Sequence, residues 1–324
     1  MSNALLDQVV ARQTLGDHDG RSGATLERLT LADGTTLVLK RADPGNELGG
    51  LLGVPDAELA LWEAGIFAHF PDAVGHAIID KWTDGDHILT LTRDLDGRIP
   101  GWSRRLTAVE CEQIMTALGA LHHAFVDHVP AGVVPLTQRL GLLSPQTMKS
   151  VDNVSGLAPH VVRGWEQFHD QVDVELSEAV QAAHRDPAGL AGAFVSAPTT
   201  LLHADLWPVN LAIDAAGVTF LDWAIATAGP AALDCSIFLS GGADHVDASR
   251  EQIIAAFRRA SGDLTDDRTM RIALFASLCD LGWNKALDAA EHDDPAQRVR
   301  AAADLGWWVE AGHAALAILD TPTL

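Results

Sequence analysis

Residues 201–234 read LLHADLWPVNLAIDAAGVTFLDWAIATAGPAALD, and this stretch decides the fold. Asp205 is followed five residues later by Asn210, and Asp222 stands at the end of an apolar run, twelve residues after Asn210. Two short apolar runs separated by turn residues lie between them and predict a β-hairpin. We expect this hairpin to bring Asn210 and Asp222 to neighbouring strand ends.

Two carboxylates and one amide at this spacing suit the transfer of a phosphoryl group. One carboxylate must lie beside the attacking hydroxyl group, and a second carboxylate with an amide must hold Mg²⁺ against the phosphates. Asp205 is the candidate for the first task, and Asn210 with Asp222 for the second. The alternative interpretation is that Asp205 lies in a turn and Asp222 ends a strand, as single aspartates in loops commonly do.

A lysine and a glutamate far upstream favour the phosphoryl-transfer hypothesis. Lys40 ends a β-branched, apolar run that predicts a strand, and Glu58 lies near the start of a predicted helix over residues 56–70. We expect Glu58 to pair with Lys40 and to aim it at the α- and β-phosphates of a nucleotide. Glu47 is a rival partner, but it lies in a stretch with Pro and Gly and no helical pattern.

The pattern His-x-Asp-x₄-Asn, a hairpin and then Leu-Asp-Trp resembles the catalytic and metal-binding segment of the aminoglycoside phosphotransferases and choline kinases. The run that follows resembles the family's segment ending in a buried aspartate, here Asp234, which would support the catalytic loop through hydrogen bonds. The resemblance implies an α+β, bilobal protein-kinase-like fold. A small antiparallel β-sheet lobe with the hinge would span residues 1–95, and a larger, mainly helical lobe with the acceptor site residues 96–324.

Two further segments are candidates for contacts with the nucleotide. The glycine-containing loop over residues 16–23 can fold backbone N–H groups over phosphates, although a plain hairpin turn explains it equally well. Its candidate contacts are Gly20, Ser22 and Gly23. The run 88–95 resembles the last strand of the small lobe entering the hinge, so that backbone groups there would bind the base. Its candidate contacts are Thr92, Arg93 and Asp94.

The acceptor is less well defined by the residues. The family that the chain resembles modifies aminoglycosides, choline, amino sugars, homoserine and other hydroxyl compounds, and fold does not choose among them. Carboxylates beside tryptophans suit a cationic or sugar-like ligand, and the candidates on one late predicted helix are Asp280, Trp283 and Asp288. The alternative is that the tryptophans belong to the core and the acids are solvated. One departure from the family pattern is Ala204, which stands where glycine is usual and predicts a slightly different loop geometry.

Composition narrows the class of protein. The formal net charge of −22 argues against a nucleic-acid partner. No apolar run approaches the roughly 18 residues of a membrane helix. The first residues lack a cationic segment followed by an apolar one, so secretion is not expected. Three scattered cysteines outside any CxxC unit indicate reduced thiols in a cytoplasmic protein.

The sequence therefore predicts a small-molecule kinase. It would move the γ-phosphate of ATP or GTP, with Mg²⁺ as cofactor, to a hydroxyl group of an aminoglycoside, an amino sugar or another hydroxylated amine. The alternative is a catalytically silent nucleotide-binding regulatory protein of the same fold. A kinase that acts on proteins is disfavoured, because no activation segment with an APE-like end follows Asp222. The oligomeric state stays open.

Overall fold

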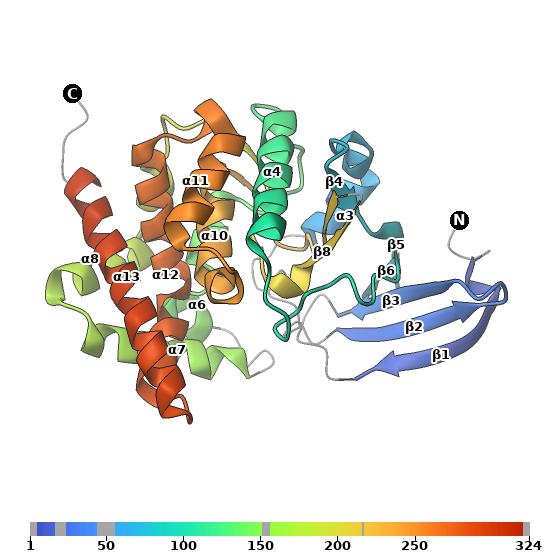
Figure 1. The fold of residues 1–324 in the computed structure, drawn as a ribbon, viewed down its shortest axis with the longest axis horizontal. Helices are drawn as coiled ribbons and strands as arrows, with labels where there is room; N and C mark the ends of the chain where they lie inside the picture. The colour runs from blue at the N-terminus through green and yellow to red at the C-terminus, as the bar shows by residue number, and fades with distance from the viewer. Residues whose placement is uncertain (1–4, 17–23, 44–55, 151–155, 216, 320–324) are drawn as a thin grey trace.

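The computed structural model of the chain describes residues 5–16, 24–43, 56–150, 156–215 and 217–319. An amino-terminal part built on a β-sheet lies beside a larger helical part (Figure 1). The α+β, two-lobed fold predicted from the sequence is thus confirmed. The predicted loop contacts Gly20, Ser22 and Gly23, and the rival Glu47, lie outside the described residues.

The sheet of the small lobe has five antiparallel strands in the order β1-β2-β3-β6-β5. Their bounds are β1 Val9–Leu15, β2 Thr25–Leu31, β3 Thr36–Ala42, β5 Ile78–Asp84 and β6 His87–Arg93. The turn residues Ala32-Asp33-Gly34 and Thr83-Asp84-Gly85-Asp86 predict hairpins, and Gly34 and Gly85 take positive φ in the turns before β3 and β6. Alternate residues pack into one leucine cluster of β2, β3 and β6, made of Leu29, Leu31, Leu37, Leu39, Leu89 and Leu91.

The register of this sheet places two lysines in one row. Lys40 of β3 and Lys81 of β5 are both paired with Thr90 of the strand between them, β6. Side chains at paired positions leave the same face of a sheet, so Lys40 and Lys81 share a face. Helix α3 (Ala57–Glu63) contacts β5. Lys81 is therefore the nearer of the two lysines to that helix.

Two predicted helices are interrupted. The predicted helix over residues 56–70 is α3 followed by a 3₁₀ turn, η1 (Ile66–His69), because Gly65 between them takes a φ of 69° that a continuing helix does not allow. The sequence of residues 161–184 also predicts one helix, but the structure has two, α7 (Leu157–Gln171) and α8 (Val174–Arg185). Asp173 separates them, since its side chain accepts a hydrogen bond from Leu176 N and caps α8.

The helical lobe is organised around α12 (Asp267–Glu291), which contacts α7, α10 and α13. Trp165, Phe168 and Trp308 are among its largest fully buried side chains. The remaining helices are α4 Ala108–Phe125, α5 Leu136–Gly141, α6 Pro145–Lys149, α9 Pro187–Gly192, α10 Ala232–Gly242, α11 Arg250–Ser261 and α13 Pro295–Leu319. Three further 3₁₀ turns are η2 Pro208–Asn210, η3 Ala243–His245 and η4 Gly262–Leu264.

Short strands between the lobes contain much of the stretch over residues 201–234. The predicted hairpin is β8 (Leu211–Asp214) with β9 (Gly217–Phe220), paired antiparallel so that Leu211 lies opposite Phe220. β4 (Val74–His76) pairs with β9 in parallel, a contact that no local sequence pattern announced. β7 (Thr200–Leu202) pairs with β10 (Thr227–Gly229). Residues 203–210 and 221–226 therefore both leave strands at the junction of the lobes.

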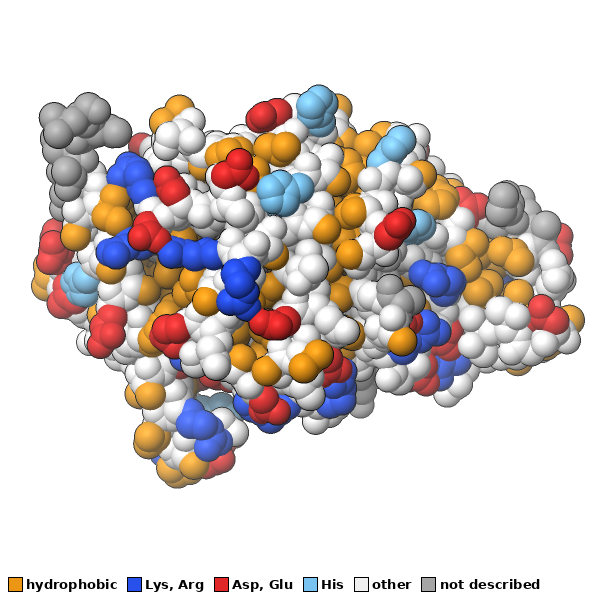
Figure 2. Space-filling view, turned by 45° about the horizontal axis from the view of Figure 1, so that its top comes forward, with side chains coloured by type: hydrophobic (Ala, Val, Ile, Leu, Met, Phe, Trp, Pro, Cys, Tyr) orange, Lys and Arg blue, Asp and Glu red, His pale blue; other side chains and the backbone are white. Residues whose placement is uncertain are grey.

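The cysteines, the charged side chains of the surface and the hydropathy of the helices can be compared with the expectations from composition. The three cysteines are free and buried, as predicted. Acidic and basic side chains are interspersed over the helical lobe on the face shown in Figure 2. Among the described residues, no helix is both long enough and apolar enough to cross a bilayer.

A buried histidine makes the stability of the helical lobe sensitive to pH. His184 of α8 donates from Nε2 to the carbonyl oxygen of Cys279 on α12, 2.8 Å away. Burial disfavours the charged imidazolium and lowers the pKa of His184 from 6.5 to about 4. The stability that this shift contributes is therefore complete above pH 6.5 and is lost as the pH falls toward 4.

We expect the free energy of unfolding of the wild type to fall by about 1 kcal/mol more than that of His184→Gln when the pH drops from about 7.5 to about 5.5. Glutamine keeps a donor for the carbonyl oxygen of Cys279 but does not titrate. Urea unfolding of both proteins at the two pH values measures the difference, in which the other titrating groups cancel. Equal losses in the two proteins would show that His184 accepts its proton in the folded state.

Candidate active site

Residues from both lobes meet in one cleft of about 1540 Å³. Lys40 from β3 lines it together with Asp205, Asn210 and Asp222. Lys40 Nζ lies 3.1 Å from both Oδ1 and Oδ2 of Asp222, across 182 positions of sequence. The structure therefore brings these four residues to one place.

The loop over residues 203–210 is held by the buried carboxylate of Asp234. Asp234 Oδ2 accepts from His203 N at 3.0 Å and from Nε2 of His122 at 3.0 Å, and Oδ1 accepts from Ala204 N at 2.8 Å. Asp234 has no exposed surface. Its place in the structure matches the supporting role that the resemblance implied.

Ala204 takes the conformation that the sequence analysis did not expect of alanine. Its φ is 65°, in the left-handed region that glycine adopts readily. Its carbonyl oxygen accepts from Arg139, 3.2 Å from Nε and 2.9 Å from Nη2, while its N–H is bound by Asp234. The peptide groups on both sides of Ala204 are therefore fixed. Ala204 therefore carries the strain of an L-residue held in a left-handed conformation.

Asp205 follows this strained residue and lies at the floor of the cleft. Its Oδ1 accepts from Nε1 of Trp207 at 2.6 Å, and its Oδ2 accepts from Nδ2 of Asn210 at 2.9 Å. Trp207 can approach because Gly241 of α10 has no Cβ, and one built there would lie 2.1 Å from the indole ring. Burial, reinforced by the charge of Asp222 and opposed by Arg139, raises the pKa of Asp205 to about 7.

Asn210 and Asp222 offer the oxygen ligands that a hard divalent cation prefers. The amide nitrogen of Asn210 donates to the backbone oxygen and to Oδ2 of Asp205, both at 2.9 Å, which turns its amide oxygen away from that residue. Burial raises the pKa of Asp222, but the charge and hydrogen bonds of Lys40 outweigh it and hold the pKa below its usual value. A charged carboxylate and a neutral amide oxygen fit Mg²⁺.

Asp222 also has a left-handed backbone, with φ at 63°. The residue before it is fixed twice: Leu221 N donates to Asn210 O at 2.9 Å, and Leu221 O accepts from Nε2 of His203 at 2.8 Å. His203 accepts at Nδ1 from Asp205 N, so its ring is the neutral tautomer with the proton on Nε2. Consistently, burial lowers the pKa of His203. His203 thus joins the loop of Asp205 to the strand end of Asp222.

The predicted pairing of Glu58 with Lys40 is wrong. Glu58 Oε1 accepts from Lys81 Nζ at 2.8 Å, and Oε2 accepts from the backbone N–H of Trp223 at 2.9 Å. Lys40 was the expected partner because it ends a predicted strand, whereas Lys81 stands in no motif. Lys81 occupies the same row of the sheet two strands nearer to α3, and it binds the carboxylate of Glu58.

The predicted hinge contacts lie at the end of β6, outside the described residues that line the cleft. Arg93 N donates to Ala77 O at 2.9 Å and Asp94 N to Thr36 O at 3.4 Å. Thr92 is paired within the sheet with Val38 and Ile78. The N–H groups of Arg93 and Asp94 are thus used within the protein, and we do not assign them to a nucleotide base.

The three predicted acceptor contacts all line the cleft, but they differ in character. Asp280 is 4% exposed, and its Oδ2 accepts from Nη2 of Arg139 at 2.9 Å. Trp283 is also 4% exposed. Asp288 lies on the same helix, α12, nearer to its carboxyl-terminal end. Asp280 therefore supports the loop of Ala204 through Arg139.

Sequence reasoning missed several residues that build this site. Arg139 and Lys81 are buried cations whose partners lie far along the chain, and neither stands in a motif. Trp207 lies inside the quoted stretch, and its place two residues after Asp205 was the one available signal. His122 has a structural role, since its ring binds the buried carboxylate of Asp234.

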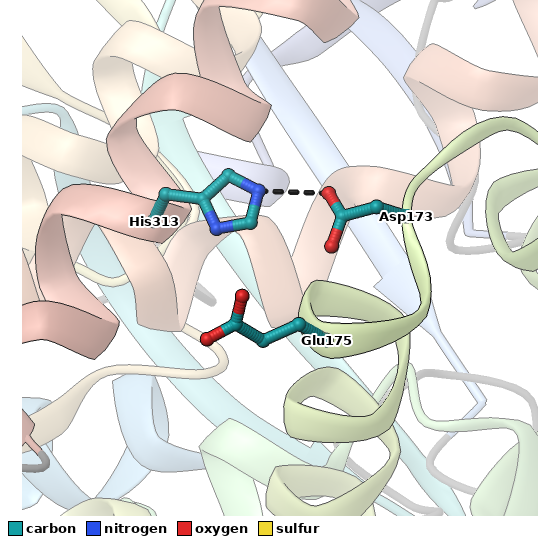
Figure 3. Close-up of side chains that lie close together, drawn as sticks. All are labelled: Asp173, Glu175 and His313. Carbon is teal, nitrogen blue, oxygen red and sulfur yellow. Dashed lines mark hydrogen bonds and ion pairs between the residues drawn. The ribbon is translucent and has the colours of Figure 1, made fainter.

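A second group of possible metal ligands lies on the helical lobe, outside the residues that line the cleft (Figure 3). It consists of Asp173, Glu175 and His313. Asp173 already accepts from Leu176 N through Oδ1 and from Nε2 of His313, at 2.7 Å, through Oδ2. Asp173 and Glu175 are exposed. The contact explains how the start of α8 is joined to α13, and we assign no ion to it.

Replacing Ala204 by glycine tests the strain at this position. We expect Ala204→Gly to be close to neutral, because relief of roughly 1–2 kcal/mol of strain offsets the buried methyl group and the chain entropy that glycine loses. Ala226 is the matched control, since it is equally buried but has no positive φ. There we expect a loss of about 1–2 kcal/mol, measured by urea unfolding. Equal losses at both positions would contradict strain at Ala204.

Comparisons with known proteins agree with this geometry. A search of the curated proteins finds no sequence match. Three solved structures share the fold. The choline kinase of Streptococcus pneumoniae is 10% identical over 97% of this chain and 96% of that one, with a TM-score of 0.55. A putative fructosamine-3-kinase of Thermobifida fusca is 18% identical over 97% and 96%, with a TM-score of 0.51.

The third is a thermostable mutant of an aminoglycoside phosphotransferase in a ternary complex with ADP and hygromycin B. It is 14% identical over 96% of this chain and 98% of that one, with a TM-score of 0.52. A family model described as the phosphotransferase enzyme family, APH, matches residues 15–272. This match covers well over half of the chain and includes every residue placed in the cleft above from Lys40 to Asp222. The chain belongs to the phosphotransferase enzyme family.

Proposed function

We propose that this phosphotransferase moves the γ-phosphate of ATP or GTP to a hydroxyl group of a small molecule, and that Asp205 accepts the proton of that hydroxyl group. The observation that carries the proposal is the convergence of Lys40, Asp205, Asn210 and Asp222 in one cleft. Each residue type matches a separate requirement of phosphoryl transfer. Two other pockets among the described residues contain no lysine.

Asp205 orients the acceptor and takes up its proton. The acceptor oxygen bonds to the γ-phosphorus while the bond from that phosphorus to the bridging oxygen breaks, and the nucleoside diphosphate leaves. The acceptor proton passes to the carboxylate of Asp205. Trp207 and Asn210 hold that carboxylate from two sides, so its orientation is set before the acceptor arrives.

Asn210 and Asp222 would hold Mg²⁺, through the amide oxygen of the one and the carboxylate of the other. The ion would supply positive charge beside the phosphate oxygens. Lys40, from the opposite lobe, neutralises further charge on the nucleotide. Its bonds to both carboxylate oxygens of Asp222 support this role, because they place its side chain beside the proposed metal ligand. Positioning and electrostatics together supply most of the acceleration in reactions of this type.

The cleft has room for a nucleotide and an acceptor together. Its volume of about 1540 Å³ exceeds the roughly 300–1,000 Å³ of a site for one small ligand. The related phosphotransferase solved with ADP and hygromycin B holds a nucleotide together with an aminoglycoside. These two observations support a nucleotide as donor and a hydroxylated amine or amino sugar as acceptor.

An aromatic wall beside Asp205 supports an acceptor with a ring or a cationic group. Trp102 and Trp207 have ring centroids 5.9 Å apart, and Trp102 and His245 have centroids 5.1 Å apart. All three line the cleft. Trp102 remains 36% exposed, which is unusual for so large an apolar side chain and leaves its ring available. Sugar rings and ammonium groups both bind on indole faces.

Replacing Asp205 tests the enzyme directly. We expect Asp205→Asn to lower the transfer rate by about 10²–10⁴-fold, because the amide does not accept the proton, while nucleotide affinity is kept. Release of ADP or GDP is measured across aminoglycosides, amino sugars, choline analogues and hydroxy amino acids. Asp214→Asn is the control, since Asp214 ends the same hairpin but pairs with Arg98 at the surface.

The same measurement separates the enzyme from a silent nucleotide-binding protein. Saturable nucleotide binding with no acceptor-dependent release of diphosphate in the wild type would favour the regulatory protein. Equal activity in the wild type and in Asp205→Asn would remove Asp205 from the reaction. The same measurement, made with ATP and with GTP in turn, determines which nucleotide the protein prefers.

Replacing Trp102 tests the aromatic wall. We expect Trp102→Ala to raise the KM for the acceptor selected by that panel by about fivefold or more, as the loss of roughly 1 kcal/mol of ring contact requires. The KM for the nucleotide stays within about twofold, and Trp102→Phe recovers most of the loss. An unchanged acceptor KM in Trp102→Ala would place the acceptor elsewhere in the cleft.

A further inference from the structure

Two lysines that share a face of the small-lobe sheet serve different carboxylates. Lys40 binds Asp222 at 3.1 Å, whereas Lys81 binds Glu58 at 2.8 Å. Both lysines are paired with Thr90, so neither is excluded from the site by its position along the strand. What separates them is the strand on which each lies, because β5 contacts α3. The helix glutamate is therefore engaged by a lysine outside the cleft-lining set.

The pair of Lys81 and Glu58 belongs to the interior. Lys81 is 6% exposed and Glu58 is 5% exposed. Asp56, which caps α3, adds a second carboxylate 2.9 Å from Lys81 Nζ. Burial alone would lower the pKa of Lys81, but the charges of Glu58 and Asp56 outweigh it and raise the pKa. Lys81 thus stays charged at neutral pH, and it fixes the carboxylate of Glu58 in one orientation.

The second oxygen of Glu58 reaches the backbone next to Asp222. Glu58 Oε2 accepts from Trp223 N at 2.9 Å, and Ala57 N of the same helix donates to Ala224 O at 3.2 Å. Asp222 itself has a φ of 63°, and such a conformation persists only where the surroundings hold it. Glu58 supplies the hydrogen bond immediately after Asp222, on the side that faces the small lobe.

We propose that Glu58, held by Lys81, is a positioning residue that fixes the strained backbone of Asp222 for metal binding, and that it does not serve Lys40. The inference rests on the proposed function, in which Asp222 is a metal ligand. Lys40 is then the cation that exchanges Asp222 for the phosphates when the nucleotide and its metal bind. Helix α3 contributes to the site through a backbone amide and not through the phosphate-binding lysine.

Metal-dependent nucleotide binding provides a test that needs no acceptor. Fluorescence of mant-ADP bound to the purified protein is titrated with MgCl₂, and affinity without metal is measured in EDTA. We expect Glu58→Gln to raise the Mg²⁺ concentration at half-saturation by about tenfold or more, the usual effect of losing a partner of a metal ligand. Its mant-ADP affinity in EDTA stays within about twofold of the wild type. Lys40→Met shows the opposite pattern, with weaker binding in EDTA.

Two further variants separate positioning from stability. Asp56→Asn loses a charge beside the same lysine, keeps the cap of α3 and does not touch Trp223, so it lowers the Tm but leaves the Mg²⁺ requirement within about twofold. The double variant Glu58→Gln with Lys81→Met removes the pair as a unit. Without a lysine facing it, the glutamine amide oxygen accepts from Trp223 N, and the Mg²⁺ requirement recovers to within about threefold of the wild type.

The outcomes that overturn the inference are distinct. A wild-type Mg²⁺ requirement in Glu58→Gln overturns it, and so does an equal shift in Asp56→Asn, which would show a general loss of stability. Weaker mant-ADP binding in EDTA for Glu58→Gln, matching Lys40→Met, would return Glu58 to Lys40. Metal-dependent binding in a wild type that transfers no phosphate contradicts only the proposed function. A wild type that binds neither mant-ADP nor Mg²⁺ contradicts both.

Discussion

Three N–H groups converge on the buried carboxylate of Asp234, and the candidate site depends on that convergence. A buried carboxylate is costly unless it is fully hydrogen-bonded, so Asp234 constrains each of its donors strongly. Two of them are the consecutive backbone amides of His203 and Ala204, and the third is the ring of His122 on α4. Because Arg139 binds the carbonyl oxygen of Ala204 from the other side, the peptide leading into Asp205 has one orientation.

Asp205 and Asp222 face opposite electrostatic conditions although they lie on one short segment of the chain. Burial and the charge of Asp222 raise the pKa of Asp205 to about 7, whereas Lys40 holds the pKa of Asp222 below its usual value. When their environments shift the pKa values of two neighbouring carboxylates in opposite directions, the two groups suit different tasks. A group that titrates near neutral pH suits the acceptance of a proton. A group that stays charged suits a cation, whether that cation is the lysine of the unliganded protein or a metal.

The sequence could predict features that arise from local patterns, but not those that arise from contacts between residues far apart in the chain. The spacing of Asp205, Asn210 and Asp222 was readable because one hairpin connects them, and the turns at Gly34 and Gly85 were readable because hairpin turns need particular residues. The partner of Glu58 was not, since Lys40 and Lys81 occupy one row of a sheet whose strand order no local pattern states. Arg139 lies 65 positions from the carbonyl oxygen that it binds, in a short helix without a motif. Its role follows only from tertiary packing.

Two buried ion pairs hold the two strained positions of the candidate site, and this arrangement explains why charges are used in the interior there. A buried pair adds little net stability compared with apolar residues of the same volume. Arg139, paired with Asp280, binds the carbonyl oxygen of Ala204, whose φ is 65°. Glu58, paired with Lys81, binds the amide that follows Asp222, whose φ is 63°. Each pair leaves one charged group able to form a strong hydrogen bond to the backbone, which an apolar pair does not offer. Since one pair comes from the helical lobe and the other from the small lobe, the site forms only where the lobes meet.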